Sequence, residues 1–215
     1  MRENNIIIRK YLPSDRDTVR AISVQTSFLE DPHLYLDDQS LIADALTLYF
    51  TDYESESSFV AVFAGRVVGY LIGTTSSDRM DKILHEKILP FLIFKIIQER
   101  LFMNKSFLTL GWNSFLSALK GEFRFPDLNK EYPGLFHINL DKDFRKYGLG
   151  RKLIERFEQY LLENNIRALH IGTMSERAKN FFIRNSFEVL FSSKRSYMTY
   201  RLREKTVFYL LGKKL

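Results

Sequence analysis

A strand, a short polar loop with two glycines and an amphipathic helix follow one another between residues 135 and 165. The apolar strand ends near Leu140, and Gly148 and Gly150 stand where the helix begins. Apolar side chains then recur at helical spacing, with charged residues between them, at Leu149, Leu153, Phe157, Tyr160 and Leu161. This order predicts a strand–loop–helix unit, and the alternation of strands and helices along the chain predicts one α/β domain.

The start of this helix has the properties of a phosphate site. The first-turn amides of a helix have no partner within it, and the helix dipole makes that end positive. A glycine has no Cβ, so a ligand can approach the backbone closely. Positive charge is added by Arg145, Lys146, Arg151 and Lys152. We therefore expect a pyrophosphate to bind here.

Two common phosphate loops do not fit this stretch. The Walker loop requires Gly-Lys-Ser/Thr after four spacer residues, and the dinucleotide fingerprint requires Gly-x-Gly-x-x-Gly. Position 153 is Leu, so only one Gly-x-Gly is present. The pattern is instead Arg/Gln-x-x-Gly-x-Gly, formed by Arg145, Gly148 and Gly150.

This pattern resembles motif A of the GNAT superfamily of N-acetyltransferases. An apolar strand precedes the loop, as in those enzymes, and a block similar to Asn-x-x-Ala-x-x-Phe-Tyr-x-x-x-Gly-Phe follows it. The residues at these downstream places are Ser175, Ala178, Phe181, Phe182, Ser186 and Phe187. The resemblance covers roughly residues 5–75 and 131–202, and it implies a mixed, mostly antiparallel twisted sheet flanked by helices.

The remaining elements follow from residue types and spacing. We expect a strand at 6–11, a helix capped by Ser14, a helix over 41–49 and a hairpin of 58–63 with 66–72. Further on we expect a strand at 168–172 and a helix capped by Thr173. The last predicted hairpin pairs 187–190 with 197–202 around Ser192-Ser193-Lys194, and 207–211 is predicted to be an edge strand or tail.

Residues 78–129 lie outside the family pattern and are predicted to be a helical insertion between the third and fourth strands of a single domain, 1–215. Four roles remain open for this insertion: a helical pair packed on the core, a lid or wall of the acceptor site, a dimer surface, or a membrane-interface patch. Its apolar content gives a reason to expect a homodimer. The run 88–97 is shorter than the about 20 apolar residues that a membrane span requires.

The composition excludes several kinds of site and partner. The chain has no cysteine, so it has no disulfide framework and no thiolate nucleophile. Its four histidines show no metal-ligand spacing, and we expect no metal. A net charge of +6 with 26 acidic residues indicates a mixed basic surface rather than a nucleic-acid partner. The N-terminus does not resemble a signal peptide, and we expect a cytoplasmic protein.

The resemblance implies that acetyl-CoA binds as co-substrate, with its pyrophosphate on the amides of Lys146 to Gly150. The strand before the loop then splays from its neighbour, and its backbone pairs with the pantetheine arm. The expected cofactor-binding residues are Asn139, Leu140, Arg145, Lys146, Tyr147, Gly148, Leu149, Gly150, Arg151 and Phe182.

The catalytic groups depart from the family pattern. The usual leaving-group acid is a tyrosine at the position of Phe182, and Phe cannot donate a proton. Three alternatives follow. Another group donates the proton (Tyr197, Tyr200 or a water), the thiolate leaves without a proton donor, or catalysis is lost. His137 is the first candidate for the general base because it titrates near neutrality. Simple alternation places it on the opposite face from Phe136, unless a bulge intervenes. Further candidates for the base are Glu131, Tyr132, Asp31 and Glu176, besides a water chain.

We therefore expect an acetyl-CoA-dependent N-acetyltransferase acting on a small-molecule or peptide amine. The alternatives are a non-catalytic CoA-binding module and a transferase with a longer acyl donor. By resemblance, the acceptor lies near the region between the first two helices, where the candidate contacts are Phe28, Glu30, Asp31 and His33.

Overall fold

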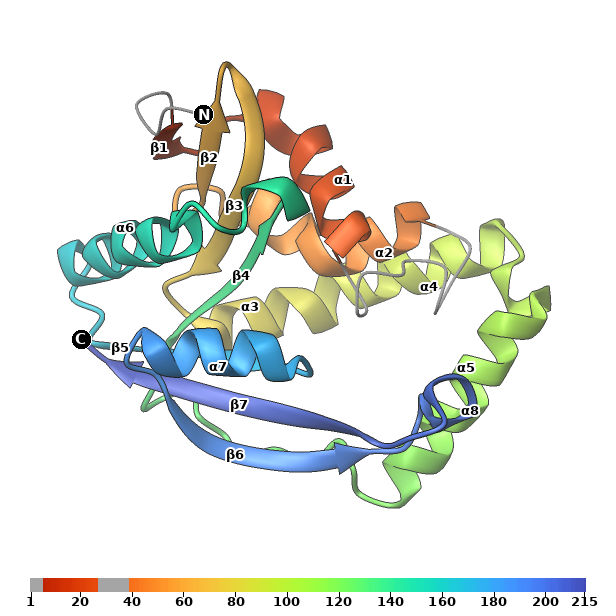
Figure 1. Ribbon diagram of the computed structural model, residues 1–215. Helices are drawn as coiled ribbons and strands as arrows, with labels where there is room; N and C mark the ends of the chain where they lie inside the picture. The colour runs from red at the N-terminus through yellow and green to blue at the C-terminus, as the bar shows by residue number, and fades with distance from the viewer. Residues whose placement is uncertain (1–5, 27–38) are drawn as a thin grey trace.

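A seven-stranded sheet organises the computed structural model, which describes residues 6–26 and 39–215. The strand order is β1-β2-β3-β4-β5-β7-β6, and every neighbouring pair is antiparallel except β4 with β5 (Figure 1). The strands are β1 (Ile6–Lys10), β2 (Phe59–Phe63), β3 (Arg66–Thr74), β4 (Gly134–Leu140), β5 (Ala168–Thr173), β6 (Glu188–Arg195) and β7 (Thr206–Lys214). The prediction of a mixed, mostly antiparallel sheet is confirmed.

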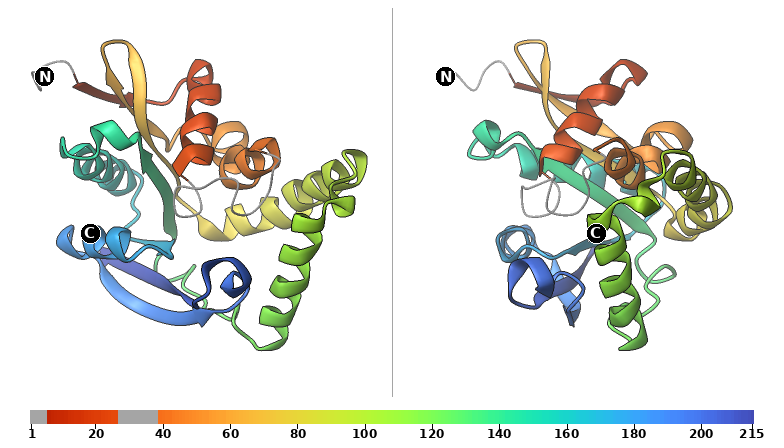
Figure 2. Two further views of the ribbon diagram at one scale, coloured as in Figure 1. Left: turned by 45° about the vertical axis from the view of Figure 1, so that its right-hand side comes forward. Right: turned by 90° about the vertical axis from the view of Figure 1, so that its right-hand side faces the viewer.

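Helices cover both faces of this sheet (Figures 1 and 2). The helices are α1 (Arg16–Thr26), α2 (Gln39–Leu48), α3 (Ser77–Ile83), α4 (Leu89–Gln98), α5 (Lys105–Leu119), α6 (Leu149–Glu163), α7 (Glu176–Arg184) and α8 (Thr199–Leu202). One core packs α6 and α7 against the sheet through Phe136, Phe157 and Phe182. The other packs α1 and α2 against it through Val19, Leu41 and other buried side chains.

The β2–β3 hairpin forms as the sequence predicts. Its two-residue turn, Ala64-Gly65, has positive φ at both positions, as the tight turn of a twisted hairpin requires. Gly69 of β3 packs closely against β4, because a Cβ there would clash with Leu140 Cδ2. The register of β2 with β3 shifts beside it, between Ala61 and Val62. Glycine therefore fits the point where β3 and β4 approach each other closely.

Both predicted helix caps lie two residues from the observed N-caps. A 3-10 turn, Pro13–Asp15, precedes α1, and its N-cap is Leu12, whose amide donates to Asp15 Oδ2 at 2.9 Å. Ser175, rather than Thr173, is the N-cap of α7, and its hydroxyl accepts from the Ala178 amide at 3.3 Å. Thr173 is instead the last residue of β5.

The predicted C-terminal hairpin is wrong in its boundaries. β6 continues through Ser192-Ser193-Lys194 to Arg195, and 197–202 forms a turn and α8. The segment predicted as an edge strand or tail is β7, which lies between β5 and β6. Because β6 is itself the edge, polar residues are tolerated along it and resemble a turn.

The segment between β3 and β4 is helical, as predicted. A π-helical turn, Leu84–Ile88, joins α3 and α4 into one continuous rod, with Pro90 in the first turn of α4. Ile88 and Leu92 of this rod are buried in the α1–α2 core. Figures 1 and 2 show α5 leaving the end of α4 and running to the tip of the β6–β7 hairpin. Within the described ranges, 6–26 and 39–215, no helix is long and apolar enough to span a membrane.

Candidate functional site

The parting of β4 and β5 defines the candidate site. The two strands pair only at Gly134 with Leu169 and at Leu135 with His170. β4 then continues to Leu140 and β5 to Thr173, and Figure 1 shows the two diverging. Among the described residues, no strand pairs with this side of β4 beyond Leu135. Unpaired backbone groups on such an edge are free to bind an extended ligand.

The loop after β4 leads directly into the N-terminus of α6. Asp141 accepts from the Asp143 amide at 3.2 Å and so caps a short 3-10 turn, Lys142–Phe144. Gly148 is the N-cap of α6 with φ of +67°, and a Cβ built there meets nothing within 4 Å. The backbone is therefore open on that side, beside amides that have no partner within the helix. This is the geometry in which a helix N-terminus binds phosphate.

Gly150 has a packing role besides the cofactor contact that the sequence predicts, and that contact stays a prediction. A Cβ at this position would lie 2.9 Å from Phe181 Cζ, so the missing side chain makes room for that ring. The second glycine therefore lets α7 pack closely on the first turn of α6. Leu149 beside it is fully buried, and its contribution to a ligand site is limited to its backbone.

The other predicted cofactor residues surround the loop. Arg145 bends back to the strand, and its Nε donates to the Leu140 carbonyl at 3.3 Å. Tyr147 packs near Phe144 with ring centroids 6.1 Å apart. Lys146 and Arg151 are exposed, and Arg151 also pairs with a glutamate one turn along α6. The structure thus gathers these residues at one end of β4, while their contact with a cofactor stays a prediction.

His137 lies on the α1–α2 face of β4, as alternation predicts, and belongs to a small polar network there. Its Nδ1 is 3.3 Å from the Tyr70 hydroxyl, and its Nε2 is 3.2 Å from Asn139 Nδ2. Asn139 Nδ2 also donates to the Tyr70 hydroxyl at 2.9 Å. Removal from water lowers the pKa of His137 to about 4. Both ring nitrogens are engaged and the ring is neutral at pH 7, which favours a positioning role over that of a free base.

Phe182 is buried in the core, whereas the Tyr197 side chain reaches the end of β5. Phe182 is 3% exposed and lies in an aromatic cluster with Phe136, Phe181 and Phe187. Its expected packing on a cofactor stays a prediction, and its ring offers little free surface for it. Tyr197, from the turn after β6, reaches the end of β5, where its hydroxyl donates to Met174 Sδ at 3.4 Å. Sequence reasoning could not find this contact, because it joins residues 23 positions apart through the fold.

The remaining base candidates are occupied elsewhere or lie outside the described residues. Glu131 pairs with Lys214 at 3.1 Å, and exposed Glu176 pairs with Lys179 and Tyr209. Tyr132 is buried, with its carbonyl bonded to His170 Nδ1. The predicted acceptor contacts in 28–33, Asp31 among them, are not part of the described chain. Among the described residues, no cluster of three or more His, Cys, Asp or Glu could hold a metal ion.

Comparison with known proteins identifies the fold. No protein-family model and no curated protein matches the sequence. Among solved structures, SsHAT matches with a TM-score of 0.74 and 23% identity, over 98% of each chain. An acetyltransferase of the GNAT family from Streptococcus pneumoniae matches with a TM-score of 0.54 and 15% identity, over 98% of this chain and 99% of that one. The chain has the GNAT fold.

A third GNAT-fold match is the Drosophila melanogaster polyamine N-acetyltransferase, an enzyme that forms N-acetylagmatine. Its TM-score is 0.65 and its identity 14%, over 98% of this chain and all of that one. The mixed, mostly antiparallel sheet flanked by helices agrees with these matches. At these identities the likeness concerns the fold, so the reaction must be argued from the site.

The lowered pKa of His137 predicts a pH-dependent contribution to stability. The unfolded chain takes up a proton on this histidine near pH 6.5, whereas the folded chain does so only near pH 4. The free energy of unfolding therefore falls as pH drops through this window, by about 2 kcal/mol between pH 7 and pH 5 for this group. Urea unfolding at both pH values should show a smaller decrease in His137→Gln than in the wild type. An equal decrease in the two proteins would contradict the assignment.

Proposed function

We propose that this chain is an acetyl-CoA-dependent N-acetyltransferase that moves an acetyl group directly to an amine. The observation that carries the proposal is the unpaired edge of β4 beyond Leu135, which leads to the open helix N-terminus at Gly148. An extended, acyl-bearing arm fits the strand edge, and the pyrophosphate at its other end fits the helix. The exposed Lys146 and Arg151 add positive charge at that end.

In this proposal the chain positions two reactants and stabilises charge. A neutral amine attacks the thioester carbonyl, so that a carbon–nitrogen bond forms and the carbon–sulfur bond breaks. An unpaired backbone N–H of β4 donates to the oxyanion, the charge that develops on the carbonyl oxygen. The amine loses one proton and the departing sulfur gains one, and no covalent enzyme intermediate is required.

Tyr197 is the proposed acid for the departing sulfur. It carries a hydroxyl to the end of β5, on the side where β4 and β5 part, and Phe182 has none to offer. For the proton of the amine we propose a water chain, because His137 is held by Tyr70 and Asn139. His137 then fixes the shape of β4 on the acceptor side.

Two alternatives follow from particular observations. The burial of Phe182 is also compatible with a module that binds CoA without turnover. The many apolar side chains of the insertion raise the second alternative, a longer acyl donor. The first predicts CoA binding with no acetylated product, and the second predicts faster turnover with a long-chain acyl-CoA than with acetyl-CoA.

Gly148→Asp should abolish most CoA binding, because it places a carboxylate where the pyrophosphate is proposed to lie. We expect the dissociation constants of CoA and acetyl-CoA, measured by isothermal titration, to rise at least tenfold, which corresponds to about 1.4 kcal/mol. Gly65→Asp is a matched control, because Gly65 also has positive φ and open space around its Cβ position. It lies in the β2–β3 turn next to Arg66, which pairs with Asp141 of the loop, so the control places a carboxylate near the loop but not at the N-terminus of α6. No binding by the wild type, or equal binding by both variants, would contradict the proposed site.

Tyr197→Phe should lower kcat while CoA binding is unchanged, because only the hydroxyl is lost. A general acid typically contributes a factor of about 100 or more, so we expect a fall of at least that order. Release of free thiol from acetyl-CoA measures the rate. The parallel variant Tyr200→Phe tests the other candidate: a loss of kcat there, with kcat retained in Tyr197→Phe, would assign the acid to Tyr200.

A further inference from the structure

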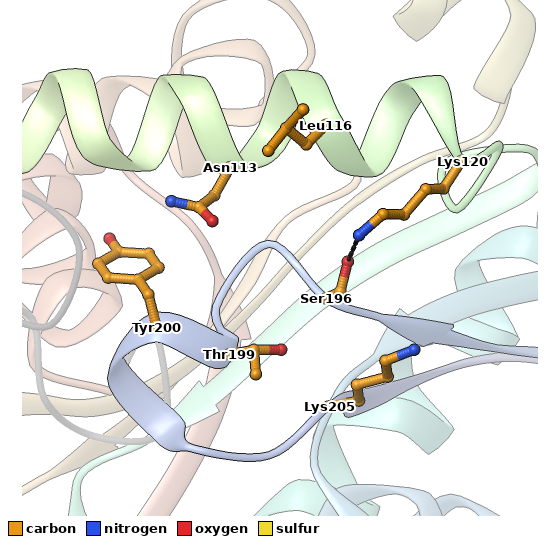
Figure 3. Close-up of a pocket in the computed structure, with 7 residues that line it drawn as sticks. All are labelled: Asn113, Leu116, Lys120, Ser196, Thr199, Tyr200 and Lys205. Carbon is orange, nitrogen blue, oxygen red and sulfur yellow. Dashed lines mark hydrogen bonds between the residues drawn. The ribbon is translucent and has the colours of Figure 1, made fainter.

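A polar pocket lies beside Tyr197 and takes no part in the site described so far. It has a volume of about 380 Å³ and lies between α5 and the segment that connects β6 to β7. Figure 3 shows Asn113, Leu116 and Lys120, from α5 and its C-cap, above Ser196, Thr199 and Tyr200 of the connecting segment, with Lys205 next to the start of β7 and its ammonium directed away from Tyr200. The lining residues are Asn113, Leu116, Lys120, Ser196, Thr199, Tyr200 and Lys205.

The position of this pocket connects it to the proposed reaction. Tyr197 follows Ser196 directly and lies two residues before Thr199, and both of these line the pocket. Consecutive Cα atoms are about 3.8 Å apart, so the pocket begins within a few ångströms of the Tyr197 backbone. The Tyr197 hydroxyl in turn reaches Met174, at the end of β5. The pocket and the proposed acid are thus carried by the same connecting segment.

The charge of the pocket is positive. Among the described residues that line it, Lys120 and Lys205 are the charged ones, and none carries a carboxylate. Glu122 is the acid in contact with its wall, but its Oε2 accepts from Ser117 Oγ at 2.6 Å and from the Ser196 amide at 2.6 Å. The neutral polar side chains of the lining are those of Asn113, Ser196, Thr199 and Tyr200, and the Lys120 ammonium donates to Ser196 Oγ at 3.3 Å.

We propose that this pocket binds the far end of the acceptor, and that this end carries a carboxylate or a phosphate. The inference rests on the N-acetyltransferase function proposed above and names its substrate class. A second ammonium group, as in a diamine, would meet two lysines of like charge, whereas an anionic group would pair with them. The acceptor is thus an amine with an acidic group at its other end.

The test uses three acceptors of equal length that differ only at one end: 4-aminobutyrate, butylamine and putrescine. In the wild type we expect kcat/KM for 4-aminobutyrate to exceed that for butylamine and for putrescine at least tenfold. The double variant Lys120→Ala/Lys205→Ala should remove this advantage and leave the butylamine rate and the CoA affinity unchanged. Lys130→Ala, an exposed lysine outside the pocket, is the control. An aminoalkyl phosphate, 2-aminoethyl phosphate, distinguishes a phosphate preference from a carboxylate preference.

Binding is measured separately from turnover, so that the two proposals can fail separately. Saturation-transfer NMR with CoA present should show 4-aminobutyrate bound to the wild type and released by the double lysine variant. If CoA binds and no amine is acetylated, the enzyme function is contradicted, and the NMR result still decides the pocket. Preference for putrescine, or equal 4-aminobutyrate binding by wild type and variant, would overturn the anionic assignment.

A different observation concerns the outer side of α5. Leu108, Trp112, Phe115 and Leu119 are 52–69% exposed and follow one another at intervals of four, three and four residues. We call these four residues the apolar ridge. This is the spacing of a coiled-coil seam, in which each side chain fits between residues of a facing helix. A shallow hollow of about 420 Å³ lies along the ridge, lined by Phe107, Leu108, Gly111, Trp112 and Phe115.

The exposed apolar area of the insertion is large enough for a stable interface. Five of its aromatic side chains are 44–62% exposed: Phe91, Phe94, Phe102, Trp112 and Phe115. At about 200 Å² for each ring, they alone expose about 500 Å². Six aliphatic side chains, 38–69% exposed, add to this: Leu89, Ile93, Ile97, Met103, Leu108 and Leu119. A standard interface requires about 800 Å² from each partner; the exposed apolar area of the insertion is of that order in total, spread over α4, the 3-10 turn Leu101–Met103 and α5, and the apolar ridge contributes its α5 part.

We infer that the apolar ridge packs against the same ridge of a second copy of this chain. A two-fold axis places identical helices side by side, and a heptad-spaced seam is self-complementary in that arrangement. The hollow beside Gly111 then accepts a large side chain from the other copy. The dimer would also support α5 from outside, where the single chain leaves the helix exposed.

Sedimentation velocity on the wild-type chain should give a concentration-dependent mass that approaches twice 25.4 kDa. Trp112 is the single tryptophan, so its fluorescence should shift to shorter wavelength over the same concentration range. Leu108→Glu/Leu119→Glu should remain monomeric with retained CoA binding, whereas Val189→Glu, on β6, should not change the mass. A monomer at every concentration would overturn the inference, as would a monomer that binds phospholipid vesicles through Trp112.

Discussion

The short contact between β4 and β5 is the constraint on which the rest of the molecule depends. Two residue pairs join the strands, after which β4 has an open edge. Unpaired backbone groups are costly when buried, so the opening must be held apart by packing and accessible to water or ligand. The aromatic cluster around Phe136 and Phe182 provides this packing, because it connects β4 to α7 across the gap. The contact of Phe181 with Gly150 adds a second tie, between α7 and α6.

The segment between β3 and β4 joins the two halves of the sheet on another side. Its first part is anchored by Asp44 of α2, which pairs with Lys95 of α4 at 2.7 Å and with Arg20 of α1 at 2.6 Å. Its last part is anchored by Arg195 of β6, which is buried and stacked on Phe123, Phe125 and Phe208. Burial lowers the pKa of Arg195, and stacking on three rings offsets part of the cost of removing it from water. The insertion is therefore packed against the rest of the protein at both of its ends.

Structural features that depend on neighbouring residues could be predicted from the sequence. Features that depend on contacts between distant segments could not. The β4–loop–α6 unit could be predicted because hydrophobic period and glycine position are local properties. β7 could not be placed between β5 and β6, since strand order is set by pairing across the sheet. The packing role of Gly150 could not be predicted, because its partner, Phe181, is distant in sequence. The Tyr70–His137–Asn139 network and the pocket under α5 arise in the same way, from strands and helices that meet only in the folded chain.

The replacement of a tyrosine by Phe182 and the presence of the insertion have a common explanation under the proposed mechanism. In the resembling family the acid is carried by the helix equivalent to α7, whereas here the proposed acid, Tyr197, comes from the turn after β6. That turn is held by α5 and the residues that follow it, through the Ser117–Ser196 contact and the bond from the Ser196 amide to Glu122. The same segment forms one wall of the pocket proposed for the acceptor. A core residue can then stand at position 182, because the insertion that forms one wall of the proposed acceptor pocket also positions Tyr197, the proposed acid.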